Sequence, residues 1–244
     1  MKKAAEYFII FIMIQFIGLT LANGVILLKG GTLDENQASA AIGMDIANFI
    51  LVIAVFVVWL KSVPVSAEYI KKKPYLQLLF CVILGFATLA PSALMQQMLP
   101  VVADNTKELF EQLLSSAKGF VVLAIIAPIT EEIVFRGAVL GALKEASKNK
   151  WTAIIISALF FAVAHFNPAQ FTHALLIGIL LGWLCVRTGS IIPGILIHII
   201  NNGAAFVIMN KFPDAPVTSL PVVIVSVAFI IISLWCIVKC TAPK

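Results

Sequence analysis

Charged residues are scarce in this sequence, and their scarcity excludes a soluble globular protein. Only 12% of the 244 residues are Asp, Glu, Lys or Arg, whereas 61% are hydrophobic. A soluble domain carries roughly 25% charged residues. The apolar runs leave almost no polar sequence for a domain outside the membrane. We therefore predict a polytopic membrane protein.

Cysteine is also scarce, and its positions predict no disulfide framework. The four cysteines lie in or at the ends of apolar runs, without the CxxC spacing of a metal site: Cys81, Cys185, Cys236 and Cys240. We expect them to act as small hydrophobic residues. The net charge of +5 does not predict a nucleic-acid partner, because the basic residues lie in short loops between apolar runs.

Eight apolar runs approach the roughly 20 residues that a helix needs to cross a bilayer. They lie near residues 7–28, 40–60, 75–99, 119–143, 151–166, 171–187, 190–210 and 217–238. The fold class is thus predicted to be all-α, a membrane helical bundle of about eight transmembrane helices in a single domain, 1–244. The fifth and sixth runs are short and could form a hairpin that does not cross fully. The first run is longer than the apolar part of a typical signal peptide, which predicts a retained span.

The segment 103–119 between the third and fourth runs has an amphipathic pattern. Its apolar residues fall on one side of a helix: Leu109, Phe110, Leu113 and Leu114. This pattern suits a helix on the membrane surface. A solvated connecting helix fits it equally well.

Basic residues are distributed unequally between the two sides of the eight-span arrangement. Twelve lie on the side of the termini, four lie on the opposite side, and Arg136 lies inside the fourth run. Because cytoplasmic loops carry an excess of Lys and Arg, we predict that both termini are cytoplasmic.

Three charged residues interrupt the fourth run, in PITEEIVFRG at 128–137. A charge at the bilayer centre costs about 2.5–3.5 kcal/mol and marks a functional or paired group. Glu132 and Arg136 are four residues apart and are predicted to pair on one helix face. Glu131 is turned about 100° from Glu132 and is predicted to face a different neighbour.

Two later runs carry further polar residues. ALFFAVAHFNP places His165 four residues after Phe161, and IIPGILIHIINNG places His198 and Asn202 one turn apart. A carboxylate that accepts a proton from water, with His and Asn donors for an oxyanion, can hydrolyse a carbonyl compound. Each residue alone could equally be a helix-packing group. Their occurrence together with Glu131 favours a hydrolytic site.

The three patterns EEIVFR, FAVAH and HIINN have the forms EExxxR, FxxxH and HxxxN, in that order and on apolar runs. In this respect the chain resembles the CPBP family of intramembrane proteases. That family includes the type II CAAX prenyl endopeptidases and the bacterial Abi proteins, among them bacteriocin-processing and self-immunity proteins. The resemblance covers about residues 119–210, which it implies to be the catalytic core.

The resemblance implies a catalytic role for four residues. Glu131 would be the general base that activates water, with assistance from His165. His198 and Asn202 would form the oxyanion hole.

Three further residues of the motifs would support the site. Glu132 and Arg136 would hold its geometry, and Phe161 would pack beneath it. His173 fits none of the patterns, and a structural or rim role is expected for it.

No metal cofactor is expected, and a divalent metal such as zinc is the alternative. Glu131, His165 and His198 could supply the three protein ligands of a catalytic zinc site. No HExxH motif is present, however, and Asn202 suits an oxyanion donor better than a ligand.

The sequence thus predicts an intramembrane endopeptidase that uses a Glu-activated water to cut a membrane-associated protein or peptide. Buried acids and histidines also occur in ion- or proton-coupled transporters, which are one alternative. A non-catalytic membrane immunity or regulatory binding protein is the other. The compact loops favour the inner membrane of a bacterial cell.

Overall fold

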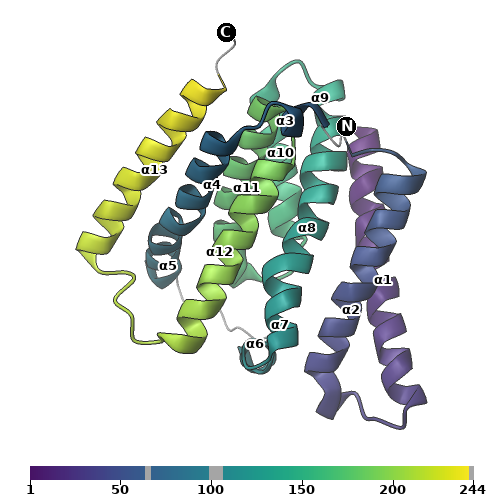
Figure 1. Cartoon of the computed structure of the whole chain (residues 1–244). Coiled ribbons are helices and arrows are strands. Elements are labelled where there is room, and N and C mark those ends of the chain that lie inside the picture. The colour runs from purple at the N-terminus through teal and green to yellow at the C-terminus, as the bar shows by residue number, and fades with distance from the viewer. Residues whose placement is uncertain (64–66, 99–106, 242–244) are drawn as a thin grey trace.

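The computed structural model describes residues 1–63, 67–98 and 107–241, and every regular element in these ranges is helical (Figure 1). The elements are α1 (Lys2–Leu28), η1 (Asp34–Asn36), α2 (Gln37–Val52), η2 (Ile53–Trp59), α3 (Ala67–Lys71), α4 (Tyr75–Ala87), α5 (Leu89–Met98), α6 (Lys107–Leu114), α7 (Ala117–Val121), η3 (Val122–Ile126), α8 (Ala127–Glu131), η4 (Glu132–Val139), α9 (Leu140–Ala146), α10 (Lys150–Val163), α11 (Pro168–Thr188), α12 (Ile192–Lys211) and α13 (Leu220–Cys240). The predicted all-α fold is confirmed.

Within the described ranges, six helices are long and apolar enough to cross a membrane. They are Lys2–Leu28, Asp34–Trp59, Tyr75–Met98, Gln170–Thr188, Ile192–Lys211 and Leu220–Cys240. The chain is therefore an integral membrane protein, but the predicted number of eight spans is not confirmed. The fourth predicted span is the helical path from α7 to α9, which carries the three charges. The fifth is α10, whose 14 residues extend about 21 Å, less than the thickness of a bilayer core.

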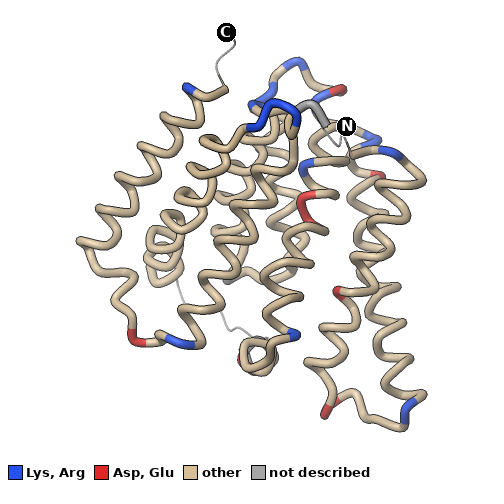
Figure 2. Tube along the Cα trace, viewed as in Figure 1, with Lys and Arg blue, Asp and Glu red and all other residues tan. Residues whose placement is uncertain are grey.

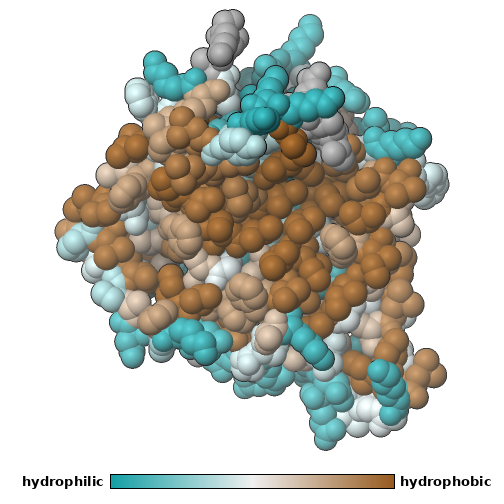
Figure 3. All heavy atoms as spheres, viewed as in Figure 1, coloured by the Kyte–Doolittle hydropathy of each residue, from teal (hydrophilic) through white to brown (hydrophobic). Residues whose placement is uncertain are grey.

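The surface of the bundle has the polarity of a membrane protein. Lys and Arg gather mainly at the end that holds both termini, with fewer at the opposite end (Figure 2). Hydrophobic side chains cover the broad zone between the two ends on the face shown in Figure 3. This arrangement agrees with the unequal distribution of basic residues along the sequence.

The amphipathic segment includes α6, which lies at the end of the bundle opposite the termini (Figure 1). Residues 103–106 of the predicted segment and the side chain of Phe110 lie outside the described part of the structure. Leu113 is buried. Leu113, one of the four residues on the predicted apolar side, therefore packs within the protein.

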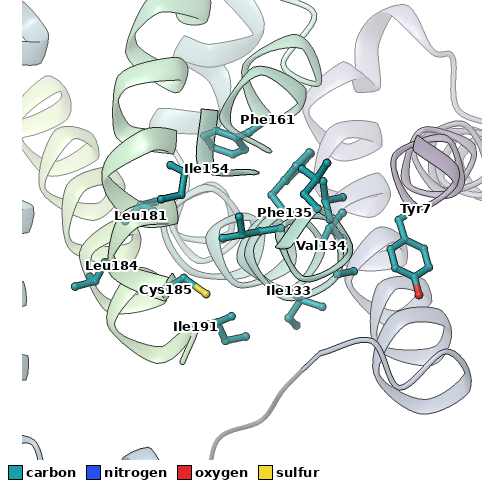
Figure 4. Packing of buried hydrophobic residues seen from close by; sticks show 14 of the residues in the cluster. Tyr7, Ile133, Val134, Phe135, Ile154, Phe161, Leu181, Leu184, Cys185 and Ile191 are labelled. Atoms are coloured by element: carbon teal, nitrogen blue, oxygen red, sulfur yellow. The ribbon is translucent and has the colours of Figure 1, made fainter. Parts of the chain in front are cut away.

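Aromatic side chains connect α1 to the helices of the predicted catalytic core. Phe8 of α1 stacks on Phe160 of α10 with ring centroids 4.8 Å apart. Phe11 meets Phe135 of η4 edge-on at 5.2 Å, and Phe135 meets Phe161 at the same separation. Figure 4 shows Phe135 and Phe161 within the cluster of buried hydrophobic residues. The first span is thus one continuous helix and part of the core.

The helix that carries the three charges departs from α-helical geometry. Its segments η3 and η4 are π-helical, a form that is rare and often found at functional sites. Two carbonyls of η4 accept hydrogen bonds from side chains of neighbouring helices. Ser157 Oγ donates to Phe135 O at 2.8 Å, and Cys185 Sγ donates to Arg136 O at 3.7 Å. Contacts from α10 and α11 therefore support the π-helical turns.

Candidate active site

Glu132 and Arg136 form the predicted ion pair inside the bundle. Arg136 Nη1 lies 3.0 Å from Glu132 Oε1, and both side chains are almost inaccessible to solvent. The guanidinium also donates through Nη2 to the carbonyl of Gly178 at 3.3 Å and lies 4.2 Å from the centroid of the Phe161 ring. A buried charge needs such compensation, because desolvation of an unpaired ion costs several kcal/mol, on the order of 3–5 when one partner is removed.

His198 lies between the two adjacent carboxylates. Its Nδ1 is 3.2 Å from Glu132 Oε1, and its Nε2 is 3.5 Å from Glu131 Oε2. The prediction that Glu131 faces a different neighbour from Glu132 is therefore wrong for this contact. The two nitrogens of one imidazole point in different directions, so two carboxylates about 100° apart on a helix can meet the same ring.

The charges of this cluster balance when His198 is protonated on both nitrogens. Two carboxylates then face one guanidinium and one imidazolium. Because Glu132 Oε1 meets both Arg136 Nη1 and His198 Nδ1, it links the guanidinium and the imidazole ring. The other oxygen of Glu132 is buried and makes no hydrogen bond to any described residue.

A glycine allows Glu132 to occupy this position. A Cβ atom added at Gly194 of α12 would lie 2.9 Å from Glu132 Oε2, closer than ordinary contact. The carboxylate can therefore approach the backbone of α12 only because no side chain is present there. This contact fixes Glu132 beside His198, which lies one turn further along the same helix.

His165 lies just beyond the end of α10, and Phe161 connects it to the rest of the site. His165 Nδ1 donates to the carbonyl of Phe161 at 2.9 Å, which leaves Nε2 of the neutral ring as an acceptor. The Phe161 ring lies 4.8 Å from the His165 ring and 5.8 Å from the His198 ring. Phe161 thus contacts both imidazoles and the Arg136 guanidinium from one position.

The two asparagines that follow His198 bond to different helices. Asn202 Nδ2 donates to the carbonyl of Leu123, in the π-helical segment η3, at 3.2 Å. Asn201 is buried, and its Nδ2 donates to Thr88 Oγ1 at 3.0 Å. A side-chain amide has two N–H donors, so Asn202 keeps one for a ligand. Asn201 has the helix-packing role that either asparagine could have had on sequence grounds.

Sequence reasoning missed Asp45, an acidic residue near the start of the second apolar run. It lines a cavity of about 20 Å³ on the side of Glu131 where α1, α2 and α8 meet. We call this the Asp45 cavity; it is lined by Phe11, Gln15, Asp45, Asn48, Ala127, Thr130 and Glu131. Glu131 therefore has two neighbours, His198 and this cavity. A single acid within an apolar run was the signal in the sequence that could have indicated it.

The alternative with a divalent metal would use Glu131, His165 and His198 as ligands. Within the described residues, no group of three or more His, Cys, Asp or Glu side chains is arranged to hold a metal ion. His173 is half-buried on α11 and belongs to none of the contacts described above.

Comparison with known proteins identifies the region that contains this site. Residues 114–204 match the family model of Rce1-like proteins, described as type II CAAX prenyl endopeptidase. The chain is also similar to YdiL of Bacillus subtilis (strain 168), a predicted membrane peptidase, with 32% identity over 103 residues. The alignment covers 41% of each of these two chains. No solved structure matches.

The matched region runs from α6 into α12 and contains all seven motif residues. It includes the ion pair, His198 with both carboxylates, and His165 beside Phe161. The first 113 residues, with Asp45, lie outside it. Over residues 114–204 the chain is therefore similar to Rce1-like proteins, and this is the region that carries the three motifs.

Proposed function

We propose that this protein is an intramembrane endopeptidase that hydrolyses a peptide bond of a membrane-associated protein or peptide. The observation that carries the proposal is the contact of 3.5 Å between Glu131 Oε2 and His198 Nε2 in a bundle of apolar helices. Glu132, which is paired with Arg136, contacts the other nitrogen of the His198 ring and so supports this contact. The similarity to Rce1-like proteins and to a predicted membrane peptidase agrees with this function.

In the proposed reaction, Glu131 accepts a proton from a water molecule that attacks the peptide carbonyl carbon. His165 Nε2, left as an acceptor by the bond from Nδ1, helps to hold that water. The carbonyl oxygen becomes an oxyanion and accepts hydrogen bonds from His198 Nε2–H and from the second amide N–H of Asn202. Glu131 then gives its proton to the leaving amine, the C–N bond breaks, and the base returns to its ionised form.

His198 suits the role of an oxyanion donor because of its second contact. Glu132 Oε1 accepts from Nδ1–H and fixes the orientation of the ring, while Nε2 points to the Glu131 side. A proton on Nε2 then makes the ring a cation with two carboxylate neighbours. That cation can stabilise negative charge on a substrate without a metal ion.

The proposed location is the inner membrane of a bacterial cell, with both termini in the cytoplasm. The distribution of basic residues supports this orientation. The similarity to a protein of Bacillus subtilis supports a bacterial host.

The test is a comparison of membrane peptides and proteins from cells that carry the wild type or Glu131→Gln. This change keeps the shape of the side chain and removes the base. We expect cleavage of the substrates so identified, measured with purified protein in proteoliposomes, to fall by about 10²-fold or more. Glu108→Gln, on the exposed side of α6, is the matched control and should cleave normally.

Two outcomes would contradict the proposal. Cleavage at the wild-type rate by Glu131→Gln would remove the base from its assigned role. Glu131-dependent ion or proton uptake by proteoliposomes without any proteolysis would favour a transporter instead.

A further inference from the structure

The Asp45 cavity lies next to the proposed base but outside the three motifs. Its volume of about 20 Å³ is enough for one water molecule. A buried water also needs two to four polar partners. Asp45, Glu131 and Gln15 come from three different helices and line the cavity together.

Asp45 has no other function visible in the structure. It makes no hydrogen bond or ion pair to any other described residue, and it lines the same cavity as Glu131. An unpaired acid within a membrane helix is costly and marks a functional group. Its partner must therefore come from outside the described side chains, and water in the cavity is the simplest one.

Asn48 provides an independent indication that the cavity binds a polar ligand. This residue is 1% exposed and lines the cavity. Its amide nitrogen donates to Gln15 Oε1, but its buried Oδ1 accepts no hydrogen bond within the described residues. A Cβ atom at Gly18 of α1 would overlap this oxygen, so the missing side chain at Gly18 makes room for it. A buried acceptor of this kind requires a donor.

We propose that the cavity binds water between Asp45 and Glu131, and that Asp45 is a positioning residue which orients Glu131 through this water. The inference rests on the proposed function, because it extends the action of the same base. Asp45 contacts neither the motif histidines nor Asn202, and it acts on the reaction only through Glu131.

The charged groups around Glu131 indicate what this water would do. Glu131 meets His198 on one side, and on the other it lines the same small cavity as the Asp45 carboxylate. Two carboxylates that line one small cavity repel each other when both are ionised, and a proton held by one of them would remove this repulsion. A water between them can carry a hydrogen bond from the protonated partner to the ionised one. The ionised carboxylate of Glu131 is then hydrogen-bonded and directed at its substrate.

The first test displaces the water without touching a polar group. Ala127→Val adds two methyl groups to the wall of the cavity. We expect kcat to fall by about tenfold or more while KM stays within about twofold, since substrate contacts are unchanged. Ala54→Val places the same substitution on an exposed face of η2 and should leave both constants unchanged.

The second test changes the acid itself. Asp45→Asn can still hydrogen-bond to water, whereas Asp45→Ala cannot, so we expect the Asn variant to keep a larger share of kcat. Asp34→Asn, at an exposed position in η1, is the matched control. A wild-type kcat in Asp45→Ala, or an equal kcat in Ala127→Val and Ala54→Val, would overturn the proposal.

A measurement that needs no substrate separates this inference from the proposed function. Infrared spectra of the wild type should contain the band of a protonated carboxylic acid, which Asp45→Asn removes and Ala127→Val shifts. If these bands behave as expected but no peptide is cleaved, the water site stands and the protease assignment fails. If Glu131-dependent cleavage is found while the band is absent and Ala127→Val is fully active, the water site alone is refuted.

Discussion

At the scale of single residues, the adjacent acids Glu131 and Glu132 have different surroundings. Glu132 is wholly buried and contacts Arg136 and His198, whereas the side chain of Glu131 is 23% exposed and lines a cavity. Glu132 is thus a structural acid, whereas the adjacent Glu131 has access to water. His198 is the group that connects them.

The buried ion pair predicts strongly non-additive effects on stability. Glu132→Gln leaves the Arg136 guanidinium without its carboxylate and should destabilise the protein by about 3–5 kcal/mol. The double variant Glu132→Leu with Arg136→Met removes both charges and should cost less than the sum of the single changes. Unfolding in detergent micelles measures the double variant and its two single variants, Glu132→Leu and Arg136→Met. Additive losses would show that the pair is not coupled.

The close approach at Gly194 predicts an effect on activity. Gly194→Ala should move the Glu132 carboxylate away from His198, because the new methyl group would lie 2.9 Å from Oε2. We expect proteolysis to fall by about tenfold or more, the size of effect that a small displacement of a positioning group produces. Gly24→Ala on α1, where an added Cβ meets nothing within 4 Å, is the control. Equal activity of the two variants would contradict the proposed role of this contact.

At the scale of elements, the π-helical segment η4 carries Glu132 and Arg136, and its geometry depends on neighbouring helices. Ser157→Ala removes the hydroxyl that donates to Phe135 O, and this carbonyl then keeps only the bond from Leu140 N–H. We expect a loss of about 0.5–1.5 kcal/mol in the free energy of unfolding and faster hydrogen exchange in η4. Ser115→Ala removes an exposed bond to Gln112 O and should change little. Equal effects at both positions would exclude this support for η4.

Local spacing predicted the helices and the pairing of Glu132 with Arg136, because both depend on residues within one turn. The contact of His198 with both carboxylates depends instead on how α12 packs against α8 and η4. The Asp45 cavity likewise requires α1, α2 and α8 to meet. Such contacts join residues far apart in the sequence, so they cannot be predicted from a periodic pattern. The π-helical turns cannot be predicted from the pattern either, and in η4 side chains of α10 and α11 donate hydrogen bonds to two of the carbonyls.

At the scale of the whole molecule, the polar groups of the site have to function within an apolar bundle. The ion pair neutralises one acid, and His198 contacts both. A water bound at Asp45 would satisfy the other side of Glu131. Together these contacts would allow ionisable groups to remain within the membrane without a large aqueous channel.

The orientation of the bundle can be measured by the accessibility of single cysteines. Lys148→Cys and Lys29→Cys, at opposite ends of the bundle, would be made in a Cys236→Ser, Cys240→Ser background, which leaves the buried Cys81 and Cys185. With twelve basic residues on the side of the termini and four on the other, position 148 should be cytoplasmic. In intact cells a membrane-impermeant thiol reagent should then label position 29 and spare position 148 until the cells are permeabilised. The reverse pattern would place the termini outside and would contradict the predicted topology.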